Sequence, residues 1–410
     1  MSTDDFDPDA VVVAAQTADG LSDFGDESLN LTLDQTIAEM AEPSALSPQE
    51  MSDLVVEFVR SQGACAVGIS TTETLAGGPP STDLDYVLEG ARSAITFALP
   101  LDQEKILKFL RKEDHSAHQA DNLRTTAAAT GIAQGLADYL NQLGIPSYGV
   151  SANLVYRDDK PDEFLEFHPD VSHRYLAVRS GVGWLGFSGN LLTEQFGANV
   201  LLGTTVTTAE LVATDPLPKE KRYCDECQLC RASCNSGFFG TDGEMTDVMI
   251  GGEEFSYTKR SSPRRCDFVC GGFTGLSKDE EWSTWSPARF GVPDEEEEVL
   301  PRLVEAVVAS GARPEFKGEG WESSGGGFYH PTMVNHKVNI SCAHCQLICH
   351  PDKEERKRRY KVITESGVVV QHEDGTLEAV SSDQARKHLL EMSPERRALY
   401  GVTSQNELEE

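Results

Sequence analysis

The chain has 410 residues, 39% of them hydrophobic, which is enough for two domains and a sizeable core. Its 67 Asp and Glu residues outnumber 35 Lys and Arg, and the resulting net charge of −32 argues against nucleic acid as a partner. The sequence has no apolar run long enough to span a bilayer and no secretion signal at its N-terminus. We therefore expect a cytoplasmic protein with reduced thiols and no membrane partner.

Residues 1–46 are acidic and poor in aromatic side chains, and they predict a mostly disordered tail. The segment Ser47-Pro-Gln-Glu50 has the pattern of a capping box, and it predicts the start of a helix. Elements of both kinds then follow: strands at 64–69 and 93–99, the end of a helix at 86–92, and helices over 103–143 with a break at 115–118. The histidines of that break, His115 and His118, are expected to be solvated.

A long polar loop is predicted over residues 147–170, and a loop of this length inside a compact domain is often functional. It concentrates side chains that could bind a ligand or transfer a proton: Tyr148, Asn153, Tyr156, Arg157, Asp158, Asp159, Glu166, His168 and Asp170. A short helix is expected at 173–180 and a strand at 199–207.

Between these two elements, Gly181-Val-Gly-Trp-Leu-Gly186 has the spacing G-x-G-x-x-G. A dinucleotide-binding turn requires a strand before this motif, whereas a helix is expected here, so we reject that function. The glycines instead indicate a tight turn or a close approach of the backbone to a large flat ligand.

Two runs of cysteines dominate the second half of the chain. They are Cys224, Cys227, Cys230 and Cys234, followed by Cys342, Cys345 and Cys349. The first run has the spacing C-x2-C-x2-C-x3-C of two-cluster ferredoxins, in which three thiolates bind one [4Fe–4S] cluster and the fourth binds another. Zinc also takes C-x2-C pairs, but two overlapping pairs crowd a four-ligand site. Disulfides are disfavoured because this spacing, in a large chain without a secretion signal, indicates metal or redox chemistry.

The remaining segments carry weaker signals. Residues 235–340 form a glycine-rich, charged insertion with two further cysteines, Cys266 and Cys270. A basic run at 353–361 predicts a solvated helix face, with docking of an acidic electron donor as the alternative. A hairpin near 367–375 and a charged helix close the chain. Cys65, inside the first strand, is expected to be a small core residue.

The order of these motifs resembles that of the cobalamin-dependent iron–sulfur reductases, a group of reductive dehalogenases and epoxyqueuosine reductases. The motifs are Gly90-Ala-Arg-Ser-Ala-Ile95, the segment 176–186, the two cysteine runs and Arg264-Arg-Cys266. The resemblance implies an α+β fold, in which a nitroreductase-like α/β core cradles a corrinoid and a ferredoxin-like domain holds two [4Fe–4S] clusters. The expected divisions are a tail at 1–46, the corrinoid-binding core at 47–215, the iron–sulfur domain at 216–362 and a C-terminal hairpin and helix at 363–410.

The resemblance also implies the cofactor contacts. One cluster would be held by Cys224, Cys227, Cys230 and Cys349. The other would be held by Cys234, Cys342, Cys345 and Cys266, with Cys270 as the alternative to Cys266. Cobalamin would be bound base-off, without a histidine below the cobalt, near Asn153, Gly181, Gly183 and Trp184.

Two activities follow from the resemblance. In reductive dehalogenases a Tyr beside a cation donates the proton, and Tyr156 with Arg157 suits those roles because the cation stabilises the phenolate. In epoxyqueuosine reductases an Asp precedes the A-G-x-G-W segment. Counting back from Trp184 reaches Phe167, and a small shift in the alignment would bring Asp170 or Glu166 to that position.

Because the net charge disfavours tRNA, we expect a reductive dehalogenase that removes halide from an organohalide. An external ferredoxin-like or flavodoxin-like donor would supply its electrons. Reductive deoxygenation of an epoxide is the first alternative. A two-cluster electron-transfer protein without a corrinoid is the second.

Overall fold

The computed structural model describes residues 46–114, 116–152, 157, 159, 168–240, 242–270, 273–274, 288–313, 344–374 and 376–402. The tail predicted over 1–46 therefore lies almost wholly outside the described residues. The mixed α and β class expected from the sequence is confirmed. Within the described segments, no helix combines the length and the apolar character needed to cross a membrane.

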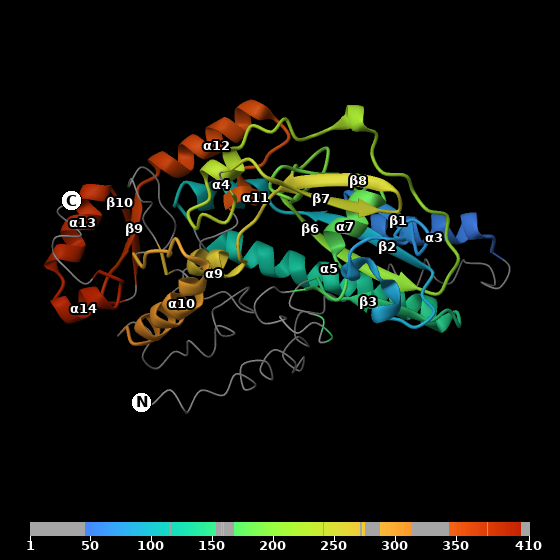
Figure 1. Ribbon diagram of the computed structural model, residues 1–410, viewed down its shortest axis with the longest axis horizontal. Coiled ribbons are helices and arrows are strands. Elements are labelled where there is room, and N and C mark those ends of the chain that lie inside the picture. The colour runs from blue at the N-terminus through green and yellow to red at the C-terminus, as the bar shows by residue number, and fades with distance from the viewer. Residues whose placement is uncertain are drawn as a thin grey trace.

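A four-stranded antiparallel sheet in the order β1-β2-β6-β3 lies in the right half of Figure 1. Its strands are β1 (Ala66–Thr71), β2 (Ser93–Pro100), β6 (Val200–Thr207) and β3 (Ser147–Val150). The strands predicted at 64–69, 93–99 and 199–207 are confirmed. The loop predicted over 147–170 is wrong at its start, because β3 pairs with β6 along the edge of the sheet.

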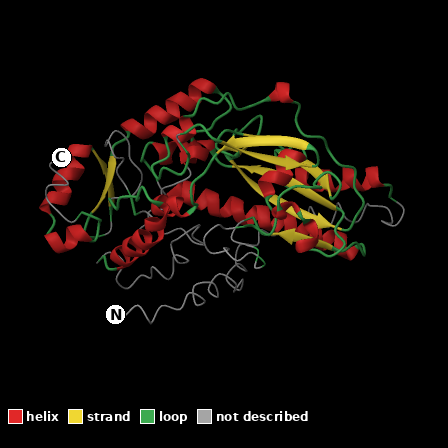
Figure 2. Ribbon diagram, in the orientation of Figure 1, coloured by secondary structure: helices red, strands yellow, loops and turns green. Residues whose placement is uncertain are grey.

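Helices cover both faces of this sheet (Figure 2). On one face lie α3 (Pro48–Ser61) and the long α5 (Ser116–Gln142), which share a core with Ile95 and Phe97 of β2. On the other face lie α7 (His173–Arg179) and the hairpin of β7 (Met245–Ile250) and β8 (Glu253–Thr258). Alternate side chains of β2 enter the two cores, which explains why almost the whole strand is apolar and buried.

Local sequence signals account for the helix boundaries. The capping box at the start of α3 is confirmed, since the Ser47 hydroxyl accepts from the backbone of Glu50 and the Glu50 carboxylate accepts from the backbone of Ser47. A break between the predicted helices is present, but it lies earlier than the predicted 115–118, because α4 (Gln103–Leu110) ends at Leu110 and α5 already begins at Ser116. The helix end predicted at 86–92 is wrong, since a 3-10 turn at Leu84–Tyr86 is followed by a turn in its place.

The prediction that His118 is solvated is wrong, whereas His115 lies outside the described residues. His118 is buried on α5, with its ring centroid 4.9 Å from that of Phe109. Burial lowers the pKa of the imidazole to about 4, so His118 is neutral at physiological pH. The prediction failed because α4 folds back against the first turns of α5, a contact that helix periodicity does not reveal.

The remaining elements lie outside this sheet, and most of them follow it in the chain. They are β4 (Trp184–Leu185), β5 (Leu191–Leu192), α8 (Leu229–Ala232), α9 (Arg264–Cys270), α10 (Glu296–Gly311), α11 (His344–Leu347), α12 (Lys353–Glu365), β9 (Val368–Gln371), β10 (Leu377–Val380), α13 (Ser382–Glu391) and α14 (Pro394–Ala398), with 3-10 turns at Pro80–Thr82 and Lys219–Lys221. The hairpin predicted near 367–375 is confirmed as the β9–β10 pair. Helix α12 packs on α4 in a separate core (Figure 1).

The basic run on α12 is not the fully solvated face predicted from its composition. Arg359 is 2% exposed and donates to Asn199 Oδ1 at 2.7 Å, to the Leu347 carbonyl at 2.7 Å and to Gln103 Oε1 at 2.8 Å. Its Nε also pairs with Glu355 at 3.0 Å. A planar guanidinium can satisfy several acceptors at once, so Arg359 joins α12 to the sheet and to the second cysteine run.

Gly68 of β1 and Gly131 of α5 differ in the space around them, so adding a methyl group should change stability in opposite directions. A Cβ at Gly68 of β1 would lie 2.2 Å from the Ser180 carbonyl oxygen, whereas a Cβ at Gly131 of α5 would meet nothing within 4 Å. We expect Gly68→Ala to lower the free energy of unfolding by about 1–3 kcal/mol through overpacking. Gly131→Ala should raise it by about 0.5–1 kcal/mol through helix propensity. Urea unfolding measures both, and equal effects of the two variants would contradict this packing.

Candidate iron–sulfur centre

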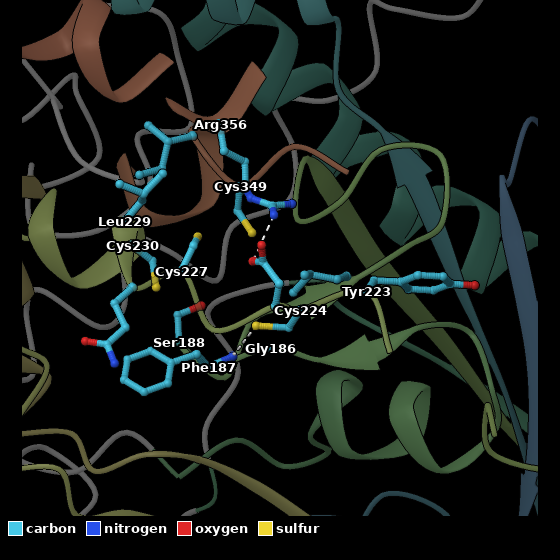
Figure 3. A pocket seen from close by; sticks show the side chains of 14 residues that line it. Gly186, Phe187, Ser188, Tyr223, Cys224, Cys227, Leu229, Cys230, Cys349 and Arg356 are labelled. Atoms are coloured by element: carbon cyan, nitrogen blue, oxygen red, sulfur yellow. Dashed lines mark hydrogen bonds and ion pairs between the residues drawn. The ribbon is translucent and has the colours of Figure 1, made fainter. Parts of the chain in front are cut away.

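Four cysteines from two distant runs line one hollow. Figure 3 shows the side chains of Cys224, Cys227, Cys230 and Cys349 pointing toward a common space. This is the set that the resemblance assigns to one cluster. Among the described residues, no three His, Cys, Asp or Glu side chains have the spacing of a single-ion site.

The first run reaches this arrangement through a tightly turned backbone. Glu226 and Gln228 adopt positive φ values of 54° and 58°, which are uncommon for residues with a side chain. Helix α8 begins directly after Gln228, and its first turn carries the buried Cys230. The turns therefore bring three successive thiols to one side of the loop.

The fourth thiol is held by the loop before β6. The backbone N–H of Ala198 donates to the Cys349 carbonyl at 2.9 Å. Gly197 has a φ of +56°, and a Cβ there would lie 2.2 Å from the same carbonyl oxygen. Only glycine satisfies both the backbone angle and this close approach, so Gly197 is required to seat the second run against the sheet.

The thiols in the hollow would need a bound positive charge to lose their protons. The pKa of the Cys230 thiol is raised to about 12, chiefly by burial and to a lesser extent by the neighbouring Cys224 and Cys227. Burial also raises the pKa of Cys349. Without a compensating positive charge these groups would remain thiols, whereas bound iron removes their protons. The Phe187 N–H donates to Cys224 Sγ at 3.3 Å, a bond that stabilises a thiolate ligand. The donor set fits a [4Fe–4S] cluster.

The second predicted set is described only in part. Cys342 lies outside the described residues, and Cys270 ends α9. Two backbone contacts, the bridge of Phe239 with Arg260 and the bond from Ser261 N to Phe238 O, join the segments that follow Cys234 and precede Cys266. Separately, the Asn190 amide donates to Cys345 Sγ at 3.7 Å. The ligand set with Cys266, and its alternative with Cys270, therefore stay predictions.

Of the candidate proton donors, Asp170 is among the described residues and Tyr156 is not. Asp170 is 5% exposed, and burial raises its pKa, although the nearby Arg157 partly opposes that shift. The Val171 N–H donates to Asp170 Oδ1 at 2.7 Å. A buried carboxyl of this kind holds its proton to higher pH than an ordinary aspartate, which is the property that a general acid needs. Tyr156 and Asn153 lie outside the described residues.

Arg157 is committed to other partners. It pairs with Asp159 at 2.7 Å, donates to the Pro80 carbonyl at 2.9 Å, and places its guanidinium 3.7 Å from the ring centroid of Tyr86. Its backbone N–H donates to the His168 carbonyl. These contacts fix Arg157 near Asp170, whose pKa its charge lowers. The contacts with Pro80 and Tyr86 were not evident from the sequence, because these two partners come from a distant segment.

The glycine-rich segment packs against the protein's own backbone. Gly181 has a φ of +72°, and its Cβ would lie 2.4 Å from the Asp215 carbonyl oxygen. A Cβ at Gly183 would lie 2.5 Å from the Leu192 carbonyl oxygen, across the β4–β5 pair that contains Trp184. Close approach is therefore observed, but to the chain itself. The role of these residues toward a corrinoid stays a prediction.

Three neighbours of the hollow were missed by sequence reasoning. Phe187 contributes a backbone N–H, Ser188 lines the hollow, and Arg356 reaches it from α12. A backbone donor leaves no signature in the sequence. The position of Arg356, seven residues after Cys349, was a usable signal that we assigned to a solvated face.

No family model matches the chain. It is 38% identical over 173 residues to an epoxyqueuosine reductase of Atelocyanobacterium thalassa, covering 42% of this chain and 51% of that protein. It is 28% identical over 158 residues to an epoxyqueuosine reductase of Gloeobacter violaceus, covering 38% and 44%. Over these segments the chain is similar in sequence to epoxyqueuosine reductases. The resemblance expected from the motifs is thus confirmed, and the chain spans about half the length of these relatives.

Solved structures give weaker likenesses. An epoxyqueuosine reductase with a modified tRNA stem loop aligns with 88% of this chain and 99% of its own, at a TM-score of 0.38 and 14% identity. A catabolic reductive dehalogenase aligns with 78% of this chain and 35% of its own, at a TM-score of 0.44 and 13% identity. At these TM-scores neither structure decides the activity of this chain.

Proposed function

We propose that the chain is an iron–sulfur and cobalamin-dependent reductase that removes the oxygen of an epoxide, as the name of its sequence relatives indicates. The observation that carries this proposal is the convergence of Cys224, Cys227, Cys230 and Cys349 on one hollow. It supports a protein through which low-potential electrons pass. The reductive dehalogenase that we expected first is not favoured, because the sequence relatives carry the other activity.

The proposed reaction balances simply. An epoxide, two electrons and two protons give an alkene and water. The clusters would deliver the electrons one at a time, and cobalamin, when bound, would supply two-electron chemistry at the carbon–oxygen bond. The described residues do not outline a cradle for the corrinoid, so Asn153, Gly181, Gly183 and Trp184 remain proposed contacts and no step is derived from them.

Asp170 would supply a proton to the leaving oxygen. Its carboxyl group is buried, and this burial raises its pKa. The backbone N–H of Arg157 donates to the carbonyl of His168, which lies two residues before Asp170. Arg157 would position this acid and limit how far its pKa rises. Tyr156 would take the role of donor only if the substrate were an organohalide.

The division of the chain supports the same proposal. Strands β1, β2, β3 and β6 fall within 47–215, the segment assigned to the corrinoid-binding core. The cysteine hollow draws on both this segment and 216–362, the segment assigned to the ferredoxin-like domain. We propose that electrons cross between the two assigned domains close to Phe187 and Cys224.

The acidic charge is unevenly distributed along the chain. Eleven of the acidic residues, and no Lys or Arg, lie in residues 1–45. The net charge of the whole chain therefore overstates the repulsion that a bound phosphate backbone would meet elsewhere. We propose an epoxyqueuosine nucleotide in a tRNA stem loop as the substrate, with an external low-potential protein as the electron donor.

Anaerobic reconstitution with iron, sulfide and cobalamin tests this function. Two cubanes and one corrinoid predict about eight irons and one cobalt per chain. The loaded protein should then convert a stem loop that carries epoxyqueuosine. Iron without cobalt would overturn the proposed reductase and leave an electron carrier. Halide release from organohalides, without epoxide conversion, would restore the dehalogenase.

A further inference from the structure

The hollow carries a buried cation that the proposed reaction does not use. Arg356 lines it together with the four cysteines, and Figure 3 shows its guanidinium beside Cys349. Only 5% of the Arg356 side chain is exposed. Its Nε is buried and has no hydrogen-bond partner among the residues that the structure describes. One N–H of this cation is therefore left for a group that these residues do not supply.

The other guanidinium nitrogens fix the position of Arg356. Nη1 donates to the carbonyls of His350 at 2.8 Å and Pro351 at 3.0 Å. Nη2 pairs with Asp225 Oδ1 at 2.8 Å, and Lys353 pairs with the other oxygen of the same carboxylate at 3.0 Å. Asp225 directly follows Cys224 in the first run. The cation of Arg356 therefore lies beside the second cysteine run, and the anion of Asp225 lies within the first.

We propose that Arg356 sets the reduction potential of the cluster held by Cys224, Cys227, Cys230 and Cys349, and that Asp225 opposes it. This inference rests on the cluster in the proposed function. Reduction adds one electron from an external donor to the cluster, with no bond broken and no proton transferred. A fixed cation stabilises the more negative reduced state and raises the potential, whereas a fixed carboxylate lowers it.

Potentiometry followed by EPR tests the two charges with opposite expected signs. Arg356→Gln should lower the potential of this cluster, and Asp225→Asn should raise it. Each shift should change the ratio of reduced to oxidised cluster about tenfold at fixed potential, which is 59 mV for a one-electron couple. Arg356→Lys keeps the charge and should stay near the wild type. The matched control is Lys357→Gln, because Lys357 is exposed on the same helix and pairs with Glu354.

The outcomes separate this inference from the proposed function. Iron analysis comes first, and a wild type that assembles no cluster would overturn both. Bound iron with equal potentials in all variants would overturn the role of Arg356 alone. Equal shifts in Arg356→Gln and Arg356→Lys would mean that geometry rather than charge acts. If Arg356→Gln fails to assemble, a lowered potential in Asp225→Asn still contradicts the inference.

Discussion

Cys349→Ser should remove one of the two clusters and reduce the iron content from about eight to about four per chain. Cys349 is the thiol from the second run that closes the hollow formed by Cys224, Cys227 and Cys230. A serine hydroxyl keeps the size of the side chain but is a poor ligand for iron in a sulfur-ligated cubane. Turnover should fall below detection, because electrons then have no complete path.

The matched control is Cys65→Ser. Cys65 precedes β1, donates to the Ala98 carbonyl at 3.3 Å, and has a pKa raised to about 11 by burial. It is therefore a packed thiol, and its replacement should leave the iron content unchanged. Iron and acid-labile sulfide assays measure both variants. Full iron content in Cys349→Ser would show that the hollow does not hold a cluster through this residue.

Asp170→Asn should lower turnover by about 10²–10⁴-fold while both clusters remain intact, since that is the usual contribution of a positioned general acid. An amide cannot supply the proton, yet it preserves the shape of the side chain and can still accept from the Val171 N–H. Single-turnover assays on the reconstituted protein measure the effect. Asp138→Asn is the control, because Asp138 is exposed on α5 and distant in the chain.

The pH dependence gives a second readout for Asp170. Burial raises its pKa in the folded state, so the acid stays protonated to higher pH and turnover should fall as pH rises through that raised value. Arg157→Gln removes the cation that opposes the shift, and should move this alkaline limb to still higher pH. A limb that does not move would contradict the electrostatic influence of Arg157 on Asp170.

The contribution of Asp170 to the free energy of unfolding should also decrease as pH rises. A carboxyl whose pKa is raised by folding favours the folded state in its protonated form. Its contribution is present below the pKa of unfolded aspartate and is lost as pH rises through the folded pKa. Asp170→Asn removes this dependence, so it should not lower the free energy of unfolding at neutral pH. A large loss of stability would point to a structural role instead of a catalytic one.

Local physics explains what sequence reasoning predicted correctly. A capping box depends on residues three apart, so Ser47 and Glu50 locate the start of α3 without knowledge of the fold. Continuous apolar runs likewise indicate β2 and β6, because a central strand is buried on both faces. The C-x2-C-x2-C spacing also specifies its chemistry locally, since the turns at Glu226 and Gln228 bring three thiols together.

Contacts between distant segments decided which cysteines meet and which charged residues become buried. Cys349 joins the first run because Gly197 lets the loop before β6 approach its backbone. Arg356 and Arg359 lie on a helix that composition marks as solvated, but Asp225 and Asn199, over a hundred residues away, bury them. The sequence by itself predicted thiolate-ligated clusters, because the spacing of the first cysteine run is a local signal. The folded contacts decided which thiols meet and which charges and proton donors surround them, because burial depends on residues that the chain brings together only when it folds.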